Sequence, residues 1–476
     1  MTEMDSGVRA AVEPLLGPSL TAEQARQIFE QGAEATVFAL LTLAKMVAAQ
    51  QALAHAPAPS APSGMKPPYQ KPPRKGRGKR PGRKAGHPGS RRPPPPQIDR
   101  SEEHVLDCCP NCAGPVTPCR GTRTRLIEDI PRDITVEVTE HTIHRYWCRR
   151  CQQVVEPVVA DALPGSTLGL RVLVLSAWLH YALGNTLSQI VEVFNYHLRL
   201  KVSTGGLVQM WYRLQEILFA WYLEIQTQAL DSAVLHADET GWRVRGKTHW
   251  LWCFTTTDLT YYLIDRKRGK TVVKKFFRRV FNGTLVTDFW GAYNSVVGGR
   301  RQKCLPHLLR ELKKVQHYHR PGGDWPDFSK QLKRLLRDGL RLRRAGPGIA
   351  YPSERQRLEQ RLQRLIDTPW QNGHARRLVK RLRRHRGELF TFLEHPEVPF
   401  DNNHGERAIR PAVIIRKNSY ANGSDAGADL QAVLMSIYRT LKQRGHNPLE
   451  TIVSAVRTYL KTGKLPLLPA RITRNG

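Results

Sequence analysis

The stretch LHADETGW, residues 235–242, decides the fold expected here, because an acidic residue ends a short apolar run inside it. The stretch LVTDFW at 285–290 repeats that pattern, and NNHGER at 402–407 places an acidic residue just after residues that favour helix caps. The candidate carboxylates are Asp238, Asp288 and Glu406. Carboxylates gathered from distant parts of a basic chain indicate a divalent-metal site that works on phosphates.

The segments around the first two stretches alternate between strand and helix in an informative order. Strand patterns at 233–235, 249–256 and 261–264 precede a helix at 269–281, a strand at 283–286 and a candidate fifth strand at 303–305. A crossover of this kind returns the fourth strand beside the first. Asp238 and Asp288 are then expected at neighbouring strand ends, where open α/β sheets bind ligands. The order is that of a ribonuclease-H-like fold.

Five longer stretches carry a family resemblance. They are HADETGWRV (236–244), TDFWGAYN (287–294), CLPHLLREL (304–312), NNHGERAIRP (402–411) and RKNSYANGSDAGA (416–428). In these stretches the chain resembles the DDE transposases of the insertion-sequence-66 family. The resemblance runs from about residue 60 to about 460 and implies that Asp238, Asp288 and Glu406 are catalytic. They would bind Mg²⁺ or Mn²⁺, with two ions about 3.5–4 Å apart.

Other polar residues compete for roles near this site. Glu239 adjoins Asp238, but successive strand residues point to opposite faces of a sheet. His307 either lies near the active site and touches phosphate or is a structural histidine. A group of basic residues surrounds Glu406 and is predicted to contact DNA phosphates, the alternative being a solvated basic face: Arg407, Arg410, Arg416 and Lys417.

Four cysteines form two C-x-x-C pairs, Cys109 with Cys112 and Cys148 with Cys151. Two such pairs can hold one tetrahedral Zn²⁺, and strand-like segments at 122–127 and 134–146 lie between them. The pattern predicts a small zinc ribbon with a structural Zn²⁺. The family resemblance implies a zinc-finger domain at this place. Cys108 and Cys119 are spare thiols that could substitute.

Composition points to a polyanionic partner. The 476 residues include 74 Lys and Arg against 41 Asp and Glu, a formal net charge of +33. Nucleic acid is the usual partner of such a chain. No segment has the features of a signal peptide or a membrane span. The few paired cysteines favour a reducing compartment.

Three segments in the N-terminal half of the chain each leave two interpretations open. An apolar stripe within 22–54 predicts a helix that either pairs with another chain or docks on its own. The basic, Pro-rich stretch at 56–100 is expected to be disordered, and it either neutralises DNA phosphates or serves as a tether. Residues 167–230 read as three helices that resemble a helix-turn-helix unit. The apolar face of the third favours packing on the core over reading DNA.

Taken along the chain, these patterns predict a multidomain α+β protein with a ribonuclease-H-like catalytic core, a mixed sheet with flanking helices. The predicted parts before the core are an N-terminal helical segment for possible dimerisation (1–55), a disordered linker (56–100), a zinc ribbon (101–160) and a helical region (161–230). The core is predicted in two parts, 231–320 and 399–476, the second of which carries the Glu406 helix. An Arg-rich helical insertion (321–398) separates them.

The resemblance implies metal-dependent DNA cleavage and strand transfer at the ends of a bacterial insertion sequence. The expected partners are double-stranded DNA, namely the element's terminal repeats and its target, further copies of the chain in the DNA complex, and helper proteins encoded by the element. The expected compartment is the bacterial cytoplasm. Two rival functions are a DNA-binding protein that has lost catalysis and a metal-dependent nuclease that does not join strands. The presence of all three carboxylates argues against the first.

Overall fold

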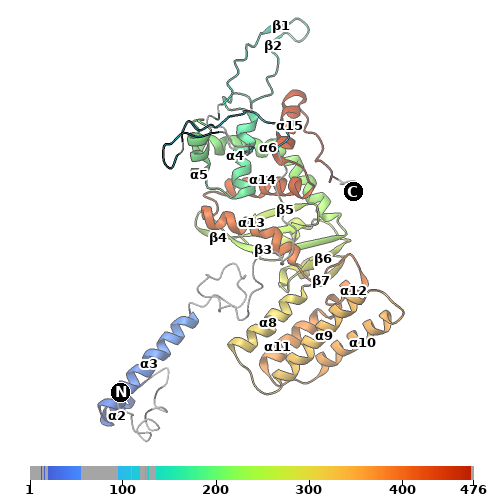
Figure 1. The fold of residues 1–476 in the computed structure, drawn as a ribbon. Coiled ribbons are helices and arrows are strands. Elements are labelled where there is room, and N and C mark those ends of the chain that lie inside the picture. The colour runs from blue at the N-terminus through green and yellow to red at the C-terminus, as the bar shows by residue number, and fades with distance from the viewer. Residues whose placement is uncertain are drawn as a thin grey trace. The chain divides into compact units, whose positions relative to one another are not determined.

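The computed structural model describes residues 12, 16, 20–54, 95–108, 110–117, 124, 126–127, 134 and 136–472. The chain separates into two compact units, residues 1–91 and 92–476. The predicted linker therefore lies outside the described residues up to position 94. Figure 1 shows the elements named below.

Among the described residues of the first unit, the stretch 22–54 forms two helices where the sequence predicted one. Helix α2 (Ala22–Glu30) begins with a capping box in which Thr21 and Gln24 bond reciprocally. Helix α3 (Ala33–Ala54) follows after Gly32. The stripe residues Val37, Leu40 and Leu41 are exposed, so pairing of this helix with another chain stays a prediction.

The centre of the second unit is a five-stranded mixed sheet in the order β5-β4-β3-β6-β7. Strands β3 (Val234–Val244), β4 (Lys247–Thr255) and β5 (Thr260–Asp265) form an antiparallel meander. After α7 (Lys270–Phe276), strand β6 (Thr284–Thr287) returns parallel to β3, and β7 (Arg300–Lys303) pairs parallel with β6. The predicted order of strands and helix is present, but α7 is shorter than the expected 269–281. The fifth strand was expected at 303–305 and instead covers Arg300–Lys303.

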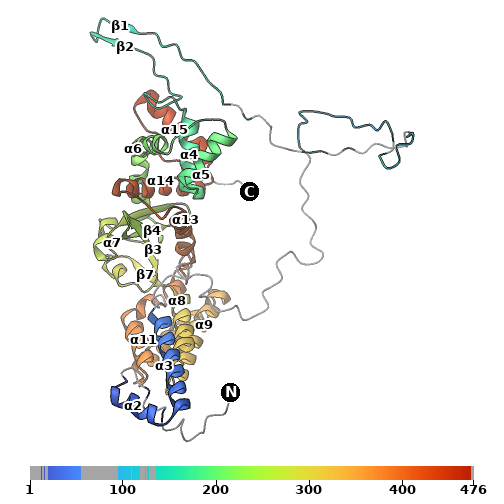
Figure 2. The same ribbon diagram turned by 90° about the vertical axis from the view of Figure 1, so that its left-hand side faces the viewer.

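Helices that precede the sheet in the sequence and helices that follow it pack around it (Figure 2). The N-terminal group comprises α4 (Leu170–Trp178), α5 (Leu187–Glu192) and α6 (Thr204–Leu230), with π-helical turns at Leu179–Leu183 and Val193–His197. Helix α6 buries Trp211, Leu214 and Trp221 in the same core as the sheet. Packing, not DNA reading, therefore occupies its apolar face. The C-terminal group is α13 (Asn403–Ser419), α14 (Asp425–Gln443) and α15 (Pro448–Thr462).

Helix α14 lies along the outer edge of β5. Ser436 Oγ accepts a hydrogen bond from the Tyr262 amide at 2.9 Å, and Thr440 Oγ1 accepts one from the Thr260 amide at 3.1 Å. Two backbone donors of this edge strand are thus satisfied by helix hydroxyl groups. At the opposite edge, the Gln302 side chain of β7 bonds the Leu389 carbonyl and the Phe392 amide.

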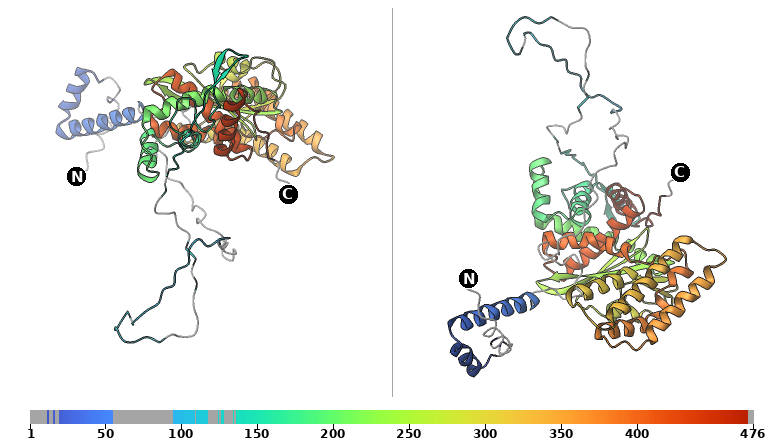
Figure 3. Two further views of the ribbon diagram at one scale, coloured as in Figure 1. Left: turned by 90° about the horizontal axis from the view of Figure 1, so that it is seen from above. Right: turned by 60° about the horizontal axis from the view of Figure 1, so that its bottom comes forward.

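The predicted insertion is a helical bundle with its own core, entered from the sheet through α8 (Leu305–Tyr318). It contains α9 (Trp325–Ala345), α10 (Tyr351–Asp367), α11 (Gly373–Arg384) and α12 (Thr391–Glu394). Figure 3 shows this bundle on one side of the sheet and the C-terminal helices on the other. The chain then returns to the sheet at α13.

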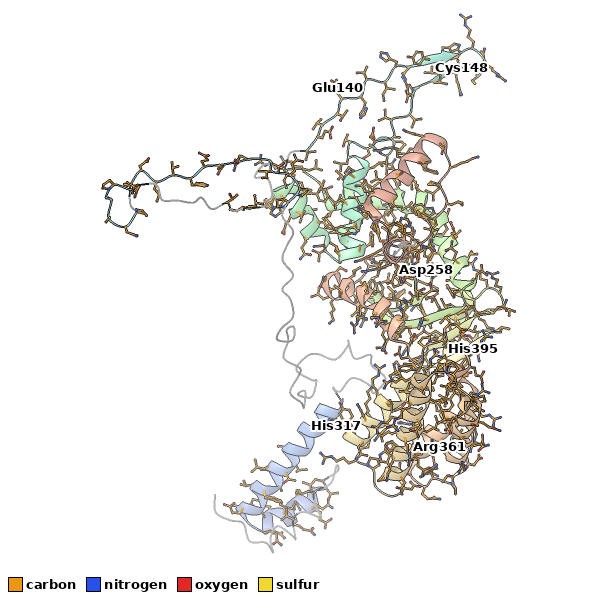
Figure 4. All side chains as sticks on the ribbon, turned by 45° about the vertical axis from the view of Figure 1, so that its right-hand side comes forward. Glu140, Cys148, Asp258, His317, Arg361 and His395 are labelled. Atoms are coloured by element: carbon orange, nitrogen blue, oxygen red, sulfur yellow. The ribbon has the colours of Figure 1, made fainter. Side chains whose placement is uncertain are left out.

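The cysteine-rich region is less regular than predicted. A two-stranded hairpin of β1 (Tyr146–Cys148) and β2 (Gln153–Val155) surrounds the second C-x-x-C pair, with Cys148 labelled in Figure 4. The strand expected at 134–146 is wrong: its described residues before Tyr146 are irregular and exposed. Alternation alone does not make a strand where no partner strand supplies hydrogen bonds.

Candidate active site

The register of the sheet brings the first two carboxylates together. Val234 pairs with Thr284 and His236 with Val286, so continuing the parallel register sets Asp238 beside Asp288. Asp288 follows the last residue of β6, as predicted. Asp238 lies inside β3, not at its end, because the hairpin with β4 carries that strand on to Val244. Asp238 and Asp288 are therefore neighbours, as predicted, but only Asp288 lies at the end of its strand.

Electrostatics link Asp238 to the third carboxylate as well. Burial raises the pKa of Asp238 well above its usual range, and the negative charges of Glu239, Asp288 and Glu406 raise it further. The backbone amide of Glu239 donates to Asp238 Oδ1 at 2.9 Å and partly opposes this. Asp238, Asp288 and Glu406 therefore share one neighbourhood in which each additional negative charge is unfavourable without a cation.

The start of α13 is fixed to β3 by Asn402. Its side chain is 1% exposed, and its Oδ1 lies 2.9 Å from His236 Nδ1 while its Nδ2 donates to the Ala237 carbonyl at 2.8 Å. The side chain of Asn402 therefore ties the start of α13 to β3 and does not cap its own helix. We call these two contacts the Asn402 bracket. Asp401 Oδ1 instead accepts from the amide of Asn403, the first residue of α13, at 3.1 Å.

Glycine is required next to this bracket. A Cβ at Gly405 would lie 2.9 Å from Asn402 Oδ1 and 3.0 Å from its Nδ2. The residue before this glycine, His404, places its Nε2 2.6 Å from the Thr256 carbonyl. The residues of NNHGER that surround Glu406 thus hold its helix against β3 and β4.

Glu406 itself is paired with a cation. Arg310 of α8 donates to Glu406 Oε1 at 2.6 Å, and His307 Nε2 lies 3.8 Å from the same oxygen. His307 thus lies near the candidate active site, which was one of the two interpretations offered by the sequence. Its pKa is lowered, first by burial and then by Arg310, while Asp288 and Glu406 oppose the shift. Arg310 was not singled out from the sequence, although it stands one helical turn after His307.

The three carboxylates do not form a preassembled cage. Throughout the described part of the chain, no three His, Cys, Asp or Glu side chains converge closely enough to hold a metal ion. Asp288 Oδ1 accepts from the Trp290 amide at 2.8 Å, and Glu406 is turned to Arg310. The donor set suits a hard divalent cation, but Glu406 has to exchange Arg310 for the ion.

A buried lysine stands behind Asp288 and was missed by the sequence analysis. Lys303 Nζ donates to Thr287 Oγ1 at 2.9 Å and to the Asp288 carbonyl at 3.1 Å, and lies 4.0 Å from Glu388 Oε2. Burial lowers the pKa of Lys303 to about 8, opposed by Glu388 and Asp288. These contacts fix the backbone at the end of β6, from which the Asp288 side chain projects.

Glu239 points to the other face of the sheet, as alternation predicted. Arg268 donates to Glu239 Oε1 through two nitrogens at 3.1 and 2.8 Å, and the Tyr293 hydroxyl donates to Oε2. The Arg268 guanidinium also lies 4.2 Å from the Trp250 ring centre and 4.1 Å from that of Trp290. Glu239 is thus engaged in a structural ion pair.

The basic residues on α13 divide into two kinds. Arg407, Arg410 and Lys417 are exposed and available to a phosphate backbone. Arg416 is partly buried and donates to Thr240 Oγ1 at 3.0 Å and to the Gly241 carbonyl. This guanidinium therefore fastens α13 to β3, and its contact with DNA stays a prediction.

In the second cysteine pair a backbone amide points at a thiol, whereas Cys109 and Cys119 lie outside the described residues. The Cys151 amide donates to Cys148 Sγ at 3.4 Å, and this backbone bond is the first cause of a lowered pKa of the Cys148 thiol. Cys112 and Cys151 are exposed free thiols. The amide-to-sulfur turn is the local geometry that a Cys-x-x-Cys zinc knuckle uses.

Together, the mixed five-stranded sheet, its flanking helices and the acidic residues on β3, after β6 and on α13 are consistent with the DDE class of ribonuclease-H-like cores. Residues 165–430 match the transposase IS66 family. Since this match spans more than half of the sequence, the chain belongs to the IS66 transposase family. Residues 107–152 match the zinc-finger binding domain of transposase IS66, which precedes the core.

Two relatives come from Sinorhizobium fredii, and both are described as uncharacterized proteins. The protein y4qI is 26% identical over 237 residues, covering 43% of this chain and 43% of the relative. The protein y4hP is 21% identical over 432 residues, covering 80% of this chain and 76% of the relative. The chain thus matches under half the length of the first relative. Among the described helices, none combines the length and apolarity needed to cross a bilayer.

Proposed function

We propose that this chain cuts DNA at the ends of an insertion element and joins those ends to a target, within the bacterial cytoplasm. Asp238, Asp288 and Glu406 are the proposed ligands of Mg²⁺ or Mn²⁺. The observation that carries the proposal is the parallel register of β3 and β6, which sets Asp238 beside Asp288. Glu406 is close enough to add, after burial and the nearer carboxylates, to the raised pKa of Asp238. In the described structure neither Asp238 nor Asp288 forms a salt bridge, and Glu406 is paired with Arg310, so a divalent cation is favoured between these carboxylates.

A bound divalent ion would supply Lewis-acid activation of an attacking oxygen and charge stabilisation at a leaving oxygen. The chain's own residues position these groups. Lys303 fixes the end of β6 and so the direction of Asp288, while Asn402 fixes the first turn of α13 and so the position of Glu406. Arg310, once released from Glu406, is placed to contact a DNA phosphate as a charge-assisted donor.

Zinc has a separate, structural place in the proposal. Cys109, Cys112, Cys148 and Cys151 are the proposed Zn²⁺ ligands, and the zinc-finger match supports them. Such a domain would bind DNA beside the core. Arg407, Arg410, Lys417 and His307 are the proposed DNA contacts around the catalytic carboxylates.

The test uses Asp288→Asn and duplexes that carry the labelled ends of the protein's own insertion element. With Mg²⁺ the parent should give cleaved and joined products, whereas Asp288→Asn should lose both by several orders of magnitude. DNA affinity should persist, because it depends on Lys and Arg. Stability without metal should not fall, because the substitution removes a charge that repels Asp238.

The matched control is Asp367→Asn on exposed α10, which removes an equal charge from a carboxylate that contacts only Gln363 in the described structure. It should cut and join DNA like the parent. Products that are cleaved but never joined would favour the nuclease, and full activity of Asp288→Asn would remove this carboxylate from the site.

A further inference from the structure

The exposed face of α9 carries a ladder of cations. They recur at helical spacing, three or four residues apart, on the side opposite the buried Phe328, Leu332 and Leu335: Lys330, Lys333, Arg334, Arg337 and Arg341. Such spacing places the charged ends in a row along one side of the helix. From Lys330 to Arg341 the row is about 17 Å long, at 1.5 Å of rise per residue.

This row borders a groove that is completed by α8. Two adjoining hollows of ≈ 540 and ≈ 450 Å³ share Gln316 and Lys333 in their walls. The second hollow is lined further by Lys313, His317 and Arg320 from the end of α8 and the loop after it. Figure 4 labels His317 at this end of the insertion. Asp338 is the one acidic residue in either wall, and it is shared by Arg341 and Arg361.

The groove presents unsatisfied polar groups. Across the described residues, Lys313, Lys330 and Lys333 have no carboxylate within 4.0 Å. Exposed cations without carboxylate partners on both walls of the groove favour an anionic ligand.

Helix α8 connects this groove to the candidate active site. Arg310 near its beginning holds Glu406, and Lys313 and His317 continue nearly the same side of the helix into the groove. Arg310 and His317 are about 10 Å apart along the helix axis. Phosphates of one DNA strand repeat about every 3.4 Å along the duplex axis, so about three phosphates span this distance.

We propose that this groove of α8 and α9 binds the phosphate backbone of DNA that extends from the catalytic carboxylates. The proposal rests on the proposed function and specifies where the substrate runs beyond the reacting bond. It assigns the insertion a positioning role: the flanking duplex is held so that the reacting phosphate reaches Asp238 and Asp288. The contacts involve only phosphates, so the groove itself selects no sequence.

The test compares two triple variants that remove equal charge from the insertion. The groove variant is Lys313→Gln, Lys330→Gln and Lys333→Gln. The control is Arg376→Gln, Lys380→Gln and Arg384→Gln, three exposed cations of α11 that do not line the groove. Affinity for a duplex of unrelated sequence is measured over a range of salt concentrations without Mg²⁺. Urea unfolding confirms that both variants are folded.

If three phosphate contacts are lost, the slope of log affinity against log salt should fall by about 2.7 in the groove variant, at about 0.9 per contact. The control should change the slope by less than one contact. Equal slopes for the two variants, or a groove variant with the parent's slope, would overturn the proposal. Because this assay needs no cleavage, an inactive parent with the expected slopes would contradict the proposed function alone.

Discussion

The bracket between Asn402 and β3 leads to a prediction about two neighbouring residues. Asn402→Ala removes the bonds to His236 and to the Ala237 carbonyl, both from a side chain that is 1% exposed. Each buried group left without its partner costs about 1–3 kcal/mol. Two groups lose their partner, so we expect the free energy of unfolding to fall by about 2–6 kcal/mol. DNA cleavage should fall by about 100-fold, as expected for a catalytic group displaced by about 1 Å.

Gly405→Ala should be harmful for a different reason. Its new Cβ would lie 2.9 Å from Asn402 Oδ1, and Asn402 cannot move away without breaking its two bonds. Overpacking of this kind costs about 1–3 kcal/mol. When Asn402→Ala is also present that contact is gone, and alanine is a better helix residue than glycine. The double variant should therefore be more stable than the sum of the single losses predicts, by about 2 kcal/mol.

Urea unfolding of the four proteins, without added Mg²⁺, measures this coupling as a double-mutant cycle. The slopes of the unfolding free energy against urea should agree, so that the midpoints report stability. Losses that add within about 0.5 kcal/mol would refute the reasoning, because they would show that the two positions do not interact.

Three further predictions concern the site, the metal domain and pH. Folded Glu239→Gln should retain DNA cleavage within about tenfold of the parent, because Glu239 faces Arg268 and Tyr293. Asp238→Asn should lose cleavage. A stable but inactive Glu239→Gln protein would reverse the assignment of these two carboxylates. Elemental analysis should find about one Zn²⁺ per chain in the parent and less in Cys148→Ser, and zinc-free parent protein would contradict the cysteine assignment. Burial lowers the pKa of His180, whose ring lies 2.7 Å from the Asn185 carbonyl, so the unfolded chain binds the extra proton first. Stability should therefore be complete above about pH 6.5 and fall as the pH drops below it, with a smaller fall in His180→Gln; equal pH dependence would exclude this histidine as the cause.

Local patterns in the sequence identified most of the core. The strand order follows from the alternation of apolar residues. The C-terminal helices also begin with local signals, since Ser424 caps α14 and Pro448 is the first residue of α15. The position of Asp288 at the end of β6 followed from the apolar run before it. The length of β3 did not, because Asp238, Glu239 and Gly241 interrupt the apolar run, and the second half is held as a strand by its pairing with β4.

The contacts that organise the site could not be read locally. Asn402 looks like a helix cap in sequence, yet its partner His236 is 166 residues away. Arg416 looks like a phosphate contact, yet its guanidinium bonds β3. Lys303 looks like an ordinary charged residue, yet it is fully buried behind Asp288. In each case residue type was informative, but the partner was set by how distant segments pack.

The covered edges of the sheet bear on how several copies of this protein can gather on one DNA element. Unpaired edge strands are templates for open-ended, fibre-like association, above all where local concentration is high. Here α14 covers β5 with Ser436 and Thr440, and the segment around Phe392 covers β7. The sheet therefore cannot be extended into a neighbouring molecule while these segments stay in place. If copies of the chain meet at two DNA ends as proposed, their contacts would therefore involve helices, loops or the DNA itself, and not the edges of the sheet.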